Sequence, residues 1–295
     1  NDEYRLFFMF RKSEKYLEDL KKINFKSSIV KIPLKLFSFD SLYFKFVDSK
    51  RLSIILSKIL LKVVEVIFLF NLFNFIFLYI NIKKINPDVV HINNGGYPGG
   101  KSANLLAIVC KLQNIKAIYT VNNIALNRNK IFYFFSYISD LAVSNSVRYF
   151  TTSSKYATNK LKKRIKNKNI YPIVNSVDDY NIKKINLNKY KKNKNTKIII
   201  TAGLLVERKG FESLLSSIII VKEKYDNFYL LICGEGSESI KLNNFIDENR
   251  LTNYVKIIGY KSNLLEYINA SDFFILPSIR NEDSPYVIIE ALMLA

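Results

Sequence analysis

Short apolar runs alternate with longer amphipathic segments along most of the chain, and this alternation is typical of an α/β protein. Runs rich in Ile, Val and Phe predict strands at residues 4–10, 28–32, 116–121, 148–152, 170–174, 197–202, 228–233 and 255–258, with two more directly after Pro87 and at 272–276. Helical periodicity lies between them, at residues 13–22, 102–113, 130–139, 154–166, 211–225 and 263–269, and in a helix that ends at residue 248. This order, with short connections, predicts parallel sheets with helices on both faces.

The length of the chain, 295 residues, suits two domains better than one core. Residues 181–195 consist almost entirely of Lys, Asn, Ile and Tyr, a composition that indicates a solvated linker. We therefore predict a first domain over residues 1–180 and a second over 181–295. Both ends are expected to be cut, because the chain starts without Met beside a strand-like run and stops within a helical pattern.

One apolar stretch bears on membrane attachment. Residues 66–82 carry no charge, and only asparagines interrupt the run. It is shorter than the roughly 20 residues that a spanning helix needs, and charged residues flank both ends. These features favour a buried helix or one that lies at an interface, while attachment to a membrane surface and a membrane span stay open as alternatives.

The chain has a formal net charge of +20 at pH 7, which favours anionic partners such as nucleotide diphosphates and lipid head groups. No nucleic-acid partner is expected, because the basic runs are not part of a recognisable binding module. Cys110 and Cys233 lie in apolar runs, so we expect both to be buried and unpaired. With a single histidine in the chain, no metal site is expected.

Two glutamates bracket the last predicted turn. Glu282 falls in the loop after the strand at 272–276, and Glu290 falls in the helix that follows. Ser284 is predicted to cap that helix, with Pro285 at its first position. Carboxylates accept hydrogen bonds from sugar hydroxyls, and the amides of a helix N-terminus suit a diphosphate. The alternative is a solvated loop followed by a solvated helix face.

Glycine-containing loops follow several predicted strands. The loop from Gly203 to Gly210 carries Arg208 and Lys209 before a helix, which is a natural cradle for a diphosphate, although an exposed cationic turn is the alternative. The turn at Gly234 lacks the rest of the dinucleotide fingerprint, which disfavours a nicotinamide cofactor. The Gly-rich residues 95–100 follow the strand after Pro87, at the edge where open α/β sheets bind ligands.

Taken in order, these motifs resemble those of the retaining glycosyltransferases of family 4. The run from Pro277-Ser278 to Glu290-Ala291 resembles the family's P-S-x-x-E-G-x-P-x-x-x-x-E-A, with Asp283 where Gly is common. The loop at residues 203–210 resembles G-R-L-x-x-x-K-G, with Leu204 where Arg is usual.

Residues 87–91, P-D-V-V-H, resemble a motif of the family's acceptor domain. Two departures follow: Asn122 stands where many members have a histidine, and Ser176 replaces the Gly of an N-G-V-D motif.

The resemblance implies the GT-B fold, in which two Rossmann-like domains face each other across a cleft, and sugar transfer from a nucleotide-diphosphate sugar to a glycan or glycolipid. It assigns Glu282 to the donor sugar, Glu290 to the ribose, and Lys209 with Arg208 to the diphosphate. The other residues that it implies on the donor side are Gly203, Gly210, Gly234, Gly259, Tyr260, Asp283, Ser284 and Pro285. His91 and Asn122 are implied on the acceptor side, and no metal or cofactor is implied.

The family also implies work in cell-envelope polysaccharide synthesis, in the cytoplasm or at the inner face of the membrane. Two rival hypotheses stay open. One is a non-catalytic protein that binds membrane surfaces on the same fold, and it draws on Leu204, Asn122 and the net charge. The other is a small integral membrane protein, which requires residues 66–82 to span. The nucleotide, the sugar and the acceptor stay open as well.

Overall fold

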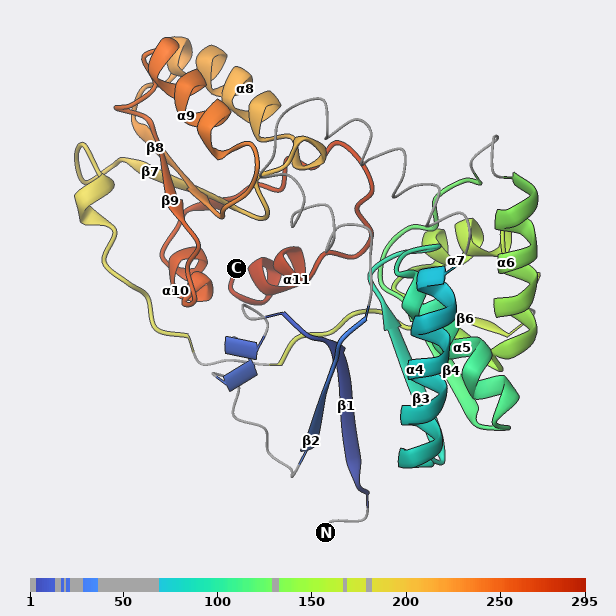
Figure 1. Ribbon diagram of the computed structural model, residues 1–295. Coiled ribbons are helices and arrows are strands. Elements are labelled where there is room, and N and C mark those ends of the chain that lie inside the picture. The colour runs from blue at the N-terminus through green and yellow to red at the C-terminus, as the bar shows by residue number, and fades with distance from the viewer. Residues whose placement is uncertain are drawn as a thin grey trace, which may run out of the picture.

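The computed structural model describes residues 4–13, 17, 18, 20, 21, 29–36, 69–128, 133–166, 169–178 and 182–295. Figure 1 shows two α/β units, which we call the first unit (residues 69–178) and the second unit (residues 182–295). Each unit holds a four-stranded parallel sheet. The predicted boundary between residues 180 and 181 lies outside the described residues.

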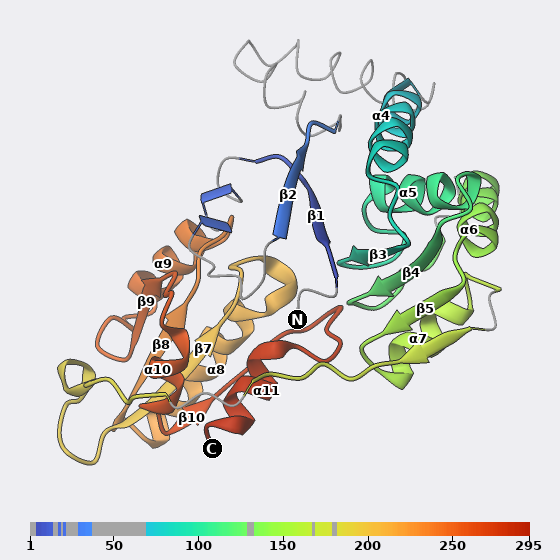
Figure 2. The ribbon, with the colours of Figure 1, turned by 90° about the horizontal axis from the view of Figure 1, so that it is seen from below.

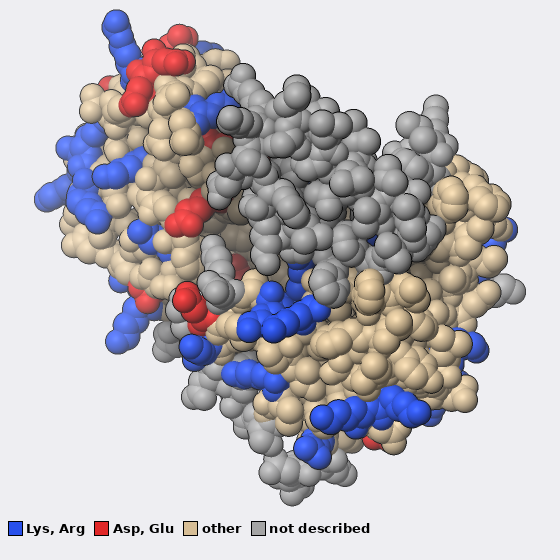
Figure 3. Space-filling view, viewed as in Figure 1, with Lys and Arg blue, Asp and Glu red and all other residues tan. Residues whose placement is uncertain are grey.

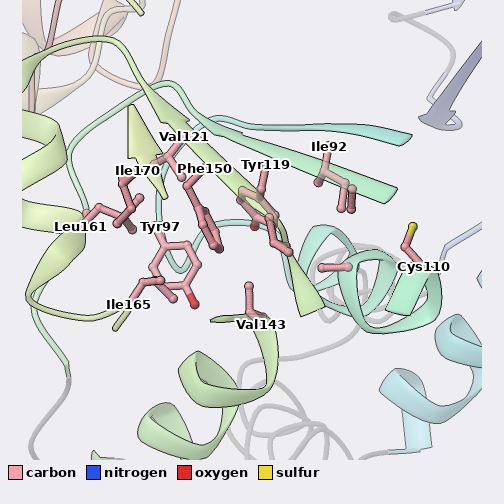
Figure 4. Packing of buried hydrophobic residues seen from close by; sticks show 14 residues of the cluster. Ile92, Tyr97, Cys110, Tyr119, Val121, Val143, Phe150, Leu161, Ile165 and Ile170 are labelled. Atoms are coloured by element: carbon pink, nitrogen blue, oxygen red, sulfur yellow. The ribbon is translucent and has the colours of Figure 1, made fainter. Parts of the chain in front are cut away.

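The sheet of the first unit has the strand order β3-β4-β5-β6, with β3 at Val89–Asn94, β4 at Lys116–Val121, β5 at Tyr149–Thr152 and β6 at Ile170–Pro172. Helices α5 (Lys101–Leu112), α6 (Tyr133–Ser146) and α7 (Lys155–Lys162) connect the strands and supply side chains to one buried core. Figure 4 shows Tyr119 and Phe150 at the centre of this core, where their ring centroids lie 5.5 Å apart.

A buried carboxylate ties the Gly-rich loop after β3 to the helices. Asp140 on α6 is 2% exposed and accepts hydrogen bonds from Tyr97 at 2.9 Å, Arg128 at 2.8 Å and both Nε and Nη2 of Arg164 at 3.1 Å. Burial and the neighbouring carboxylate raise the pKa of Tyr97 well above its usual value. Because the buried charge is fully hydrogen-bonded, the cluster fixes the loop that ends β3.

The sheet of the second unit has the order β10-β7-β8-β9, with β7 at Lys197–Ala202, β8 at Phe228–Cys233, β9 at Val255–Gly259 and β10 at Phe273–Phe274. Helices α8 (Phe211–Lys224) and α9 (Ser239–Glu248) cover one face, and α10 (Leu264–Asn269) and α11 (Tyr286–Met293) cover the other (Figure 1). Because both faces are covered, the strands are continuous apolar runs rather than alternating ones.

Two further strands, β1 (Leu6–Arg11) and β2 (Ile29–Leu34), form a separate parallel pair. Leu34 packs with Leu78 and Ile82 of α4 (Leu69–Ile85), the helix that contains most of the predicted apolar stretch. Among the described helices, none has both the length and the apolar character to cross a membrane. Residues 66–68, where that stretch begins, lie outside the described residues.

The prediction for the two cysteines is confirmed. Cys110 and Cys233 are buried and unpaired, and burial raises the pKa of each thiol to about 12.

The prediction of a solvated linker over residues 181–195 is wrong in part. Leu187 is only 4% exposed, and the ring of Tyr190 lies 5.6 Å from that of Tyr229 on the sheet. The apolar residues of this Lys-rich stretch are spaced so that they pack on the second unit while the lysines face solvent.

Candidate active site

Three predicted glycines meet at the carboxyl edge of the second sheet. The Gly203 N–H donates to the carbonyl of Cys233, and the Gly234 N–H donates to that of Gly259, both at 3.0 Å. At Gly234, where φ is 148°, an added Cβ would lie 1.9 Å from the Gly203 carbonyl oxygen. No side chain fits there, so the loops after β7, β8 and β9 lie against one another through their backbones. Tyr260, directly after β9, is 71% exposed beside them.

The loop after β7 is joined to the loop after β10. Gly210 has φ of 70°, which ends a short 3₁₀ turn (Glu207–Lys209) and begins α8. An added Cβ at Gly210 would lie 2.2 Å from the carbonyl oxygen of Pro277, and the Ile279 N–H donates to the carbonyl of Arg208 at 3.0 Å. Glycine is needed here because only it combines this φ with such a close approach.

These joined loops bring the predicted donor-side charges into one cluster. Glu282 accepts hydrogen bonds from Arg208 at 3.0 Å, from Ser278 at 3.2 Å and from Lys209. The Lys209 side chain is 13% exposed and that of Glu282 is 22% exposed, while that of Arg208 is 38% exposed, so the cluster is partly shielded from water. The family resemblance implied that Glu282 would contact the donor sugar. In the structure its carboxylate instead neutralises one of the two positive charges predicted to hold a diphosphate.

Glu290 has a different environment. It is half-buried on α11, and the described residues show no hydrogen bond or ion pair to its carboxylate. Burial raises the pKa of Glu290 above its usual value, since nothing offsets the lost hydration. A half-buried carboxylate without a protein partner is suited to accept hydrogen bonds from a ligand's hydroxyl groups.

The predicted cap of this helix is wrong. Pro285 occupies the N-cap position with ψ of 130°, and no side chain caps α11. Ser284 has φ of 44°, and its carbonyl accepts a hydrogen bond from the Asn175 side chain at 2.8 Å. The left-handed backbone at Ser284 turns the chain toward the first unit, so its side chain does not reach the helix amides.

Asp283 contacts the first unit. Its Oδ2 accepts a hydrogen bond from Ser153 at 2.6 Å, and its Oδ1 accepts one from Ser154. Figure 2 shows the loop before α11 extending toward the first sheet. Ser153, Ser154 and Asn175 are not among the site residues that the sequence predicted. The helix start predicted at Ser154 is confirmed, since Ser154 is the N-cap of α7, but no local pattern indicates a partner 129 residues away.

On the first unit, the two predicted acceptor-side residues lie in different places. Asn122 follows β4 at the carboxyl edge, where its amide side chain donates to Asn93 and its carbonyl oxygen lies 3.4 Å from Ser153 Oγ. His91 is the third residue of β3, not its last, and its Nε2 lies 2.7 Å from Thr120 Oγ1. The described contacts therefore connect Asn122, but not His91, to the residues around Asp283.

A hollow of about 280 Å³ lies between the two units. It is lined by Ile124, Ala125, Leu126, Asn127, Tyr156 and Lys160 of the first unit, and by Arg280 and Asn281 of the second. The Lys160 ammonium lies 5.3 Å from the centre of the Tyr156 ring. Among the described residues, no group of three or more His, Cys, Asp or Glu side chains is placed to hold a metal ion.

Comparisons with known proteins find similarity to glycosyltransferases. Residues 182–295 match the family model of the glycosyl transferases group 1. An uncharacterized glycosyltransferase of Methanocaldococcus jannaschii is 36% identical over 34% of this chain and 25% of its own length. The capsular polysaccharide biosynthesis glycosyltransferase CapH of Staphylococcus aureus is 26% identical over 74% of this chain and 61% of its own. The chain thus spans between a quarter and about three fifths of these relatives.

Among solved structures, HepE of Anabaena in complex with UDP superposes with a TM-score of 0.58 and 16% identity, over 74% of this chain and 61% of that one. The protein has the GT-B fold, as the sequence predicted. Over residues 182–295, the chain is similar to the glycosyl transferases group 1.

Proposed function

We propose that this chain catalyses the retaining transfer of a sugar from a nucleotide-diphosphate sugar to a glycan or glycolipid acceptor, in the manner of glycosyltransferase family 4. One observation carries the proposal. Arg208, Lys209 and Glu282, which come from two loops of the second unit, form a single, partly shielded cluster at the carboxyl edge of its sheet. Ligands of open α/β sheets bind at this edge.

The donor roles follow from the charges and the backbone. The diphosphate lies against Lys209 and Arg208, beside the backbone of the glycine loops, and Glu290 accepts hydrogen bonds from the ribose. Gly259 and Tyr260 contact the base. Solved structures of HepE hold UDP, glucose or UDP-glucose, which supports a uridine nucleotide as the first donor to try. The two cations supply the positive charge that the leaving diphosphate requires, and the proposal includes no resident metal or cofactor.

The chemistry needs charge stabilisation and positioning. The acceptor oxygen forms a bond to the anomeric carbon as the bond from that carbon to the phosphate oxygen breaks, and the acceptor proton passes to the departing diphosphate. When the diphosphate binds Arg208 and Lys209, it displaces the carboxylate of Glu282. That carboxylate can then accept hydrogen bonds from the sugar hydroxyls. Fixed charges aimed at the leaving group act without reorganisation during the reaction, which makes them effective in a shielded site.

The acceptor side combines the hollow between the units with an apolar surface on the first unit. Exposed large side chains lie on α4 (Leu72, Phe73, Ile76 and Ile80) and on α6 (Phe134, Phe135, Ile138 and Leu141). On the face in Figure 3, Lys and Arg side chains lie over both units. Exposed apolar side chains and a net charge of +20 suit the surface of an anionic membrane, so we propose a peripheral, cytoplasmic-side enzyme of envelope polysaccharide synthesis.

Thermal-shift titration and turnover assays test the proposal, with UDP, GDP, ADP and their sugar conjugates as ligands. A ligand that binds only the folded state stabilises it, by about 2.7 kcal/mol at a hundred times its Kd. We expect one nucleotide to raise the Tm, and the K209Q and E290Q variants to lose most of the shift. K241Q is the matched control, because Lys241 pairs with Glu212 on the surface of the same unit.

If no nucleotide raises the Tm and no sugar is transferred, the proposal fails. Binding to anionic liposomes in that case would favour the rival hypothesis of a non-catalytic membrane-surface protein. The observation behind that rival is Leu204, which is exposed and uncharged where the family's pattern has an arginine.

A further inference from the structure

Three consecutive residues of the loop before α11 each bind a different part of the molecule. The Glu282 carboxylate binds the cations of the second unit. The Asp283 carboxylate binds Ser153 and Ser154 of the first unit. The Ser284 carbonyl accepts a hydrogen bond from Asn175, which follows β6. The loop that carries the donor-side glutamate is therefore held from both sides of the boundary between the units.

The contact of Asp283 with the two serines, which we call the clasp, satisfies both oxygens of the carboxylate. Ser153 is 3% exposed, so its hydrogen bond is shielded from water. Ser154 donates to Asp283 while its Oγ accepts from the Ala157 N–H at 3.0 Å, as the N-cap of α7. The carboxylate thus lies at the N-terminal end of a helix, where negative charge is favoured.

The clasp also connects the two sides of the proposed reaction. The Ser153 hydroxyl that donates to Asp283 lies 3.4 Å from the carbonyl of Asn122, on the acceptor side. Asp283 is adjacent in sequence to Glu282, on the donor side. Two residues therefore link the edge of the first sheet to the donor-side cluster. The family pattern commonly has Gly where this chain has Asp283, and Gly has no side chain that could make the contact.

We propose that Asp283 is a positioning residue, which holds the first and second units in register so that Glu282 and the cations face the acceptor. The inference rests on the proposed function, and it assigns Asp283 to the contact between the units rather than to the donor. A displacement of about 1 Å between reacting groups can cost on the order of a hundredfold in rate. Loss of the clasp is expected to lower kcat at least tenfold while nucleotide binding within the second unit persists.

A matched pair of variants at Ser154 tests the clasp without removing the helix cap. Asp and Asn both cap helices about as well as Ser. S154D places a second carboxylate against Asp283 and opposes the contact, whereas S154N keeps a donor for it. In the double variant S154D/D283N, the donor and acceptor are exchanged and the contact is restored.

The readouts are kcat for sugar transfer, the Kd for UDP and the radius of gyration from small-angle X-ray scattering. We expect S154D to lower kcat at least tenfold, to change the Kd for UDP less than threefold and to increase the radius. S154N and the double variant should keep most of the wild-type kcat and the wild-type radius. Wild-type kcat and radius in S154D would overturn the inference, and so would a double variant as impaired as S154D.

The scattering measurement separates this inference from the proposed function. If the wild-type protein transfers no sugar, the proposed function fails and the positioning role fails with it. An expanded S154D and a compact S154N would still establish the contact between the units. Equal radii for the two variants would show that the clasp does not hold them.

Discussion

Replacement of Glu282 by Gln should tighten the binding of UDP while it slows sugar transfer. Gln has nearly the same shape as Glu but no charge. In the wild-type protein, the diphosphate has to compete with the Glu282 carboxylate for Arg208 and Lys209, because that carboxylate accepts hydrogen bonds from both cations. The variant removes the competing charge and leaves both cations available. It also removes the carboxylate that is proposed to contact the donor sugar, so kcat should fall.

The size of the effect follows from the geometry. Two unit charges 3.0 Å apart, the distance from Arg208 to Glu282, attract by about 5.5 kcal/mol at an effective dielectric constant of about 20. The Arg208 side chain is 38% exposed, so most of this attraction is offset by hydration, and pairs of this kind contribute up to about 1 kcal/mol. Removing the competing carboxylate from both cations should make the binding free energy of UDP about 1–2 kcal/mol more favourable. This corresponds to UDP binding that is roughly fivefold to thirtyfold tighter.

Isothermal titration calorimetry with UDP is the assay, at about 0.05 and 0.15 M salt, since screening should reduce the difference. E223Q is the control, because Glu223 is an exposed carboxylate at the opposite end of α8 from Gly210. The reasoning is refuted if E282Q binds UDP no more tightly than the wild-type protein while E223Q is unchanged. Tighter binding in E223Q to the same degree would refute it too, because the effect would then reflect net charge alone.

Four further predictions concern binding and stability. E290Q should weaken UDP binding about tenfold to a hundredfold, as expected for a lost hydrogen bond to a charged group. Burial raises the pKa of Glu290 in the folded state, so the ionised form of Glu290 opposes folding. At pH 8, E290Q should therefore have a higher Tm than the wild-type protein, and this difference should vanish as the pH falls below the usual pKa of Glu. An equal difference at every pH would contradict this reasoning. G210A should have a lower urea midpoint of unfolding than G259A. Both glycines have φ of 70°, but only at Gly210 would the new Cβ clash, with the Pro277 oxygen. Equal midpoints would contradict the clash. D140N should lower the free energy of unfolding, measured with urea, by about 3–5 kcal/mol, because it leaves buried guanidinium groups without their counter-charge. A decrease of less than about 1 kcal/mol would contradict this.

Much of the fold could be predicted from local sequence. Apolar runs at residues 197–202 and 228–233 coincide with β7 and β8, because strands buried on both faces need continuous apolar side chains. Helix lengths were less accurate. The helix predicted at 130–139 is α6, at Tyr133–Ser146, since its last turns are stabilised by packing rather than by local propensity.

The candidate site was predictable only as a set of residues. Glycines, cations and glutamates at recurring spacings predicted the candidate residues, because a glycine loop before a helix has the same local geometry wherever it occurs. Their contacts were not predictable. The ion pairs of Glu282 join loops separated by about seventy residues, and the bond from Ser154 to Asp283 spans 129.

The sequence by itself thus determined most of the elements and the burial of Cys110 and Cys233, since each depends on neighbours along the chain. Only the tertiary structure decided that Glu282 lies on the cations and that Asp283 binds the first unit. The physical reason is that hydrogen bonds depend on distance and direction in space. The backbone turn at Ser284 shows this, because it removes a predicted helix cap and brings Asp283 against two serines of the other unit.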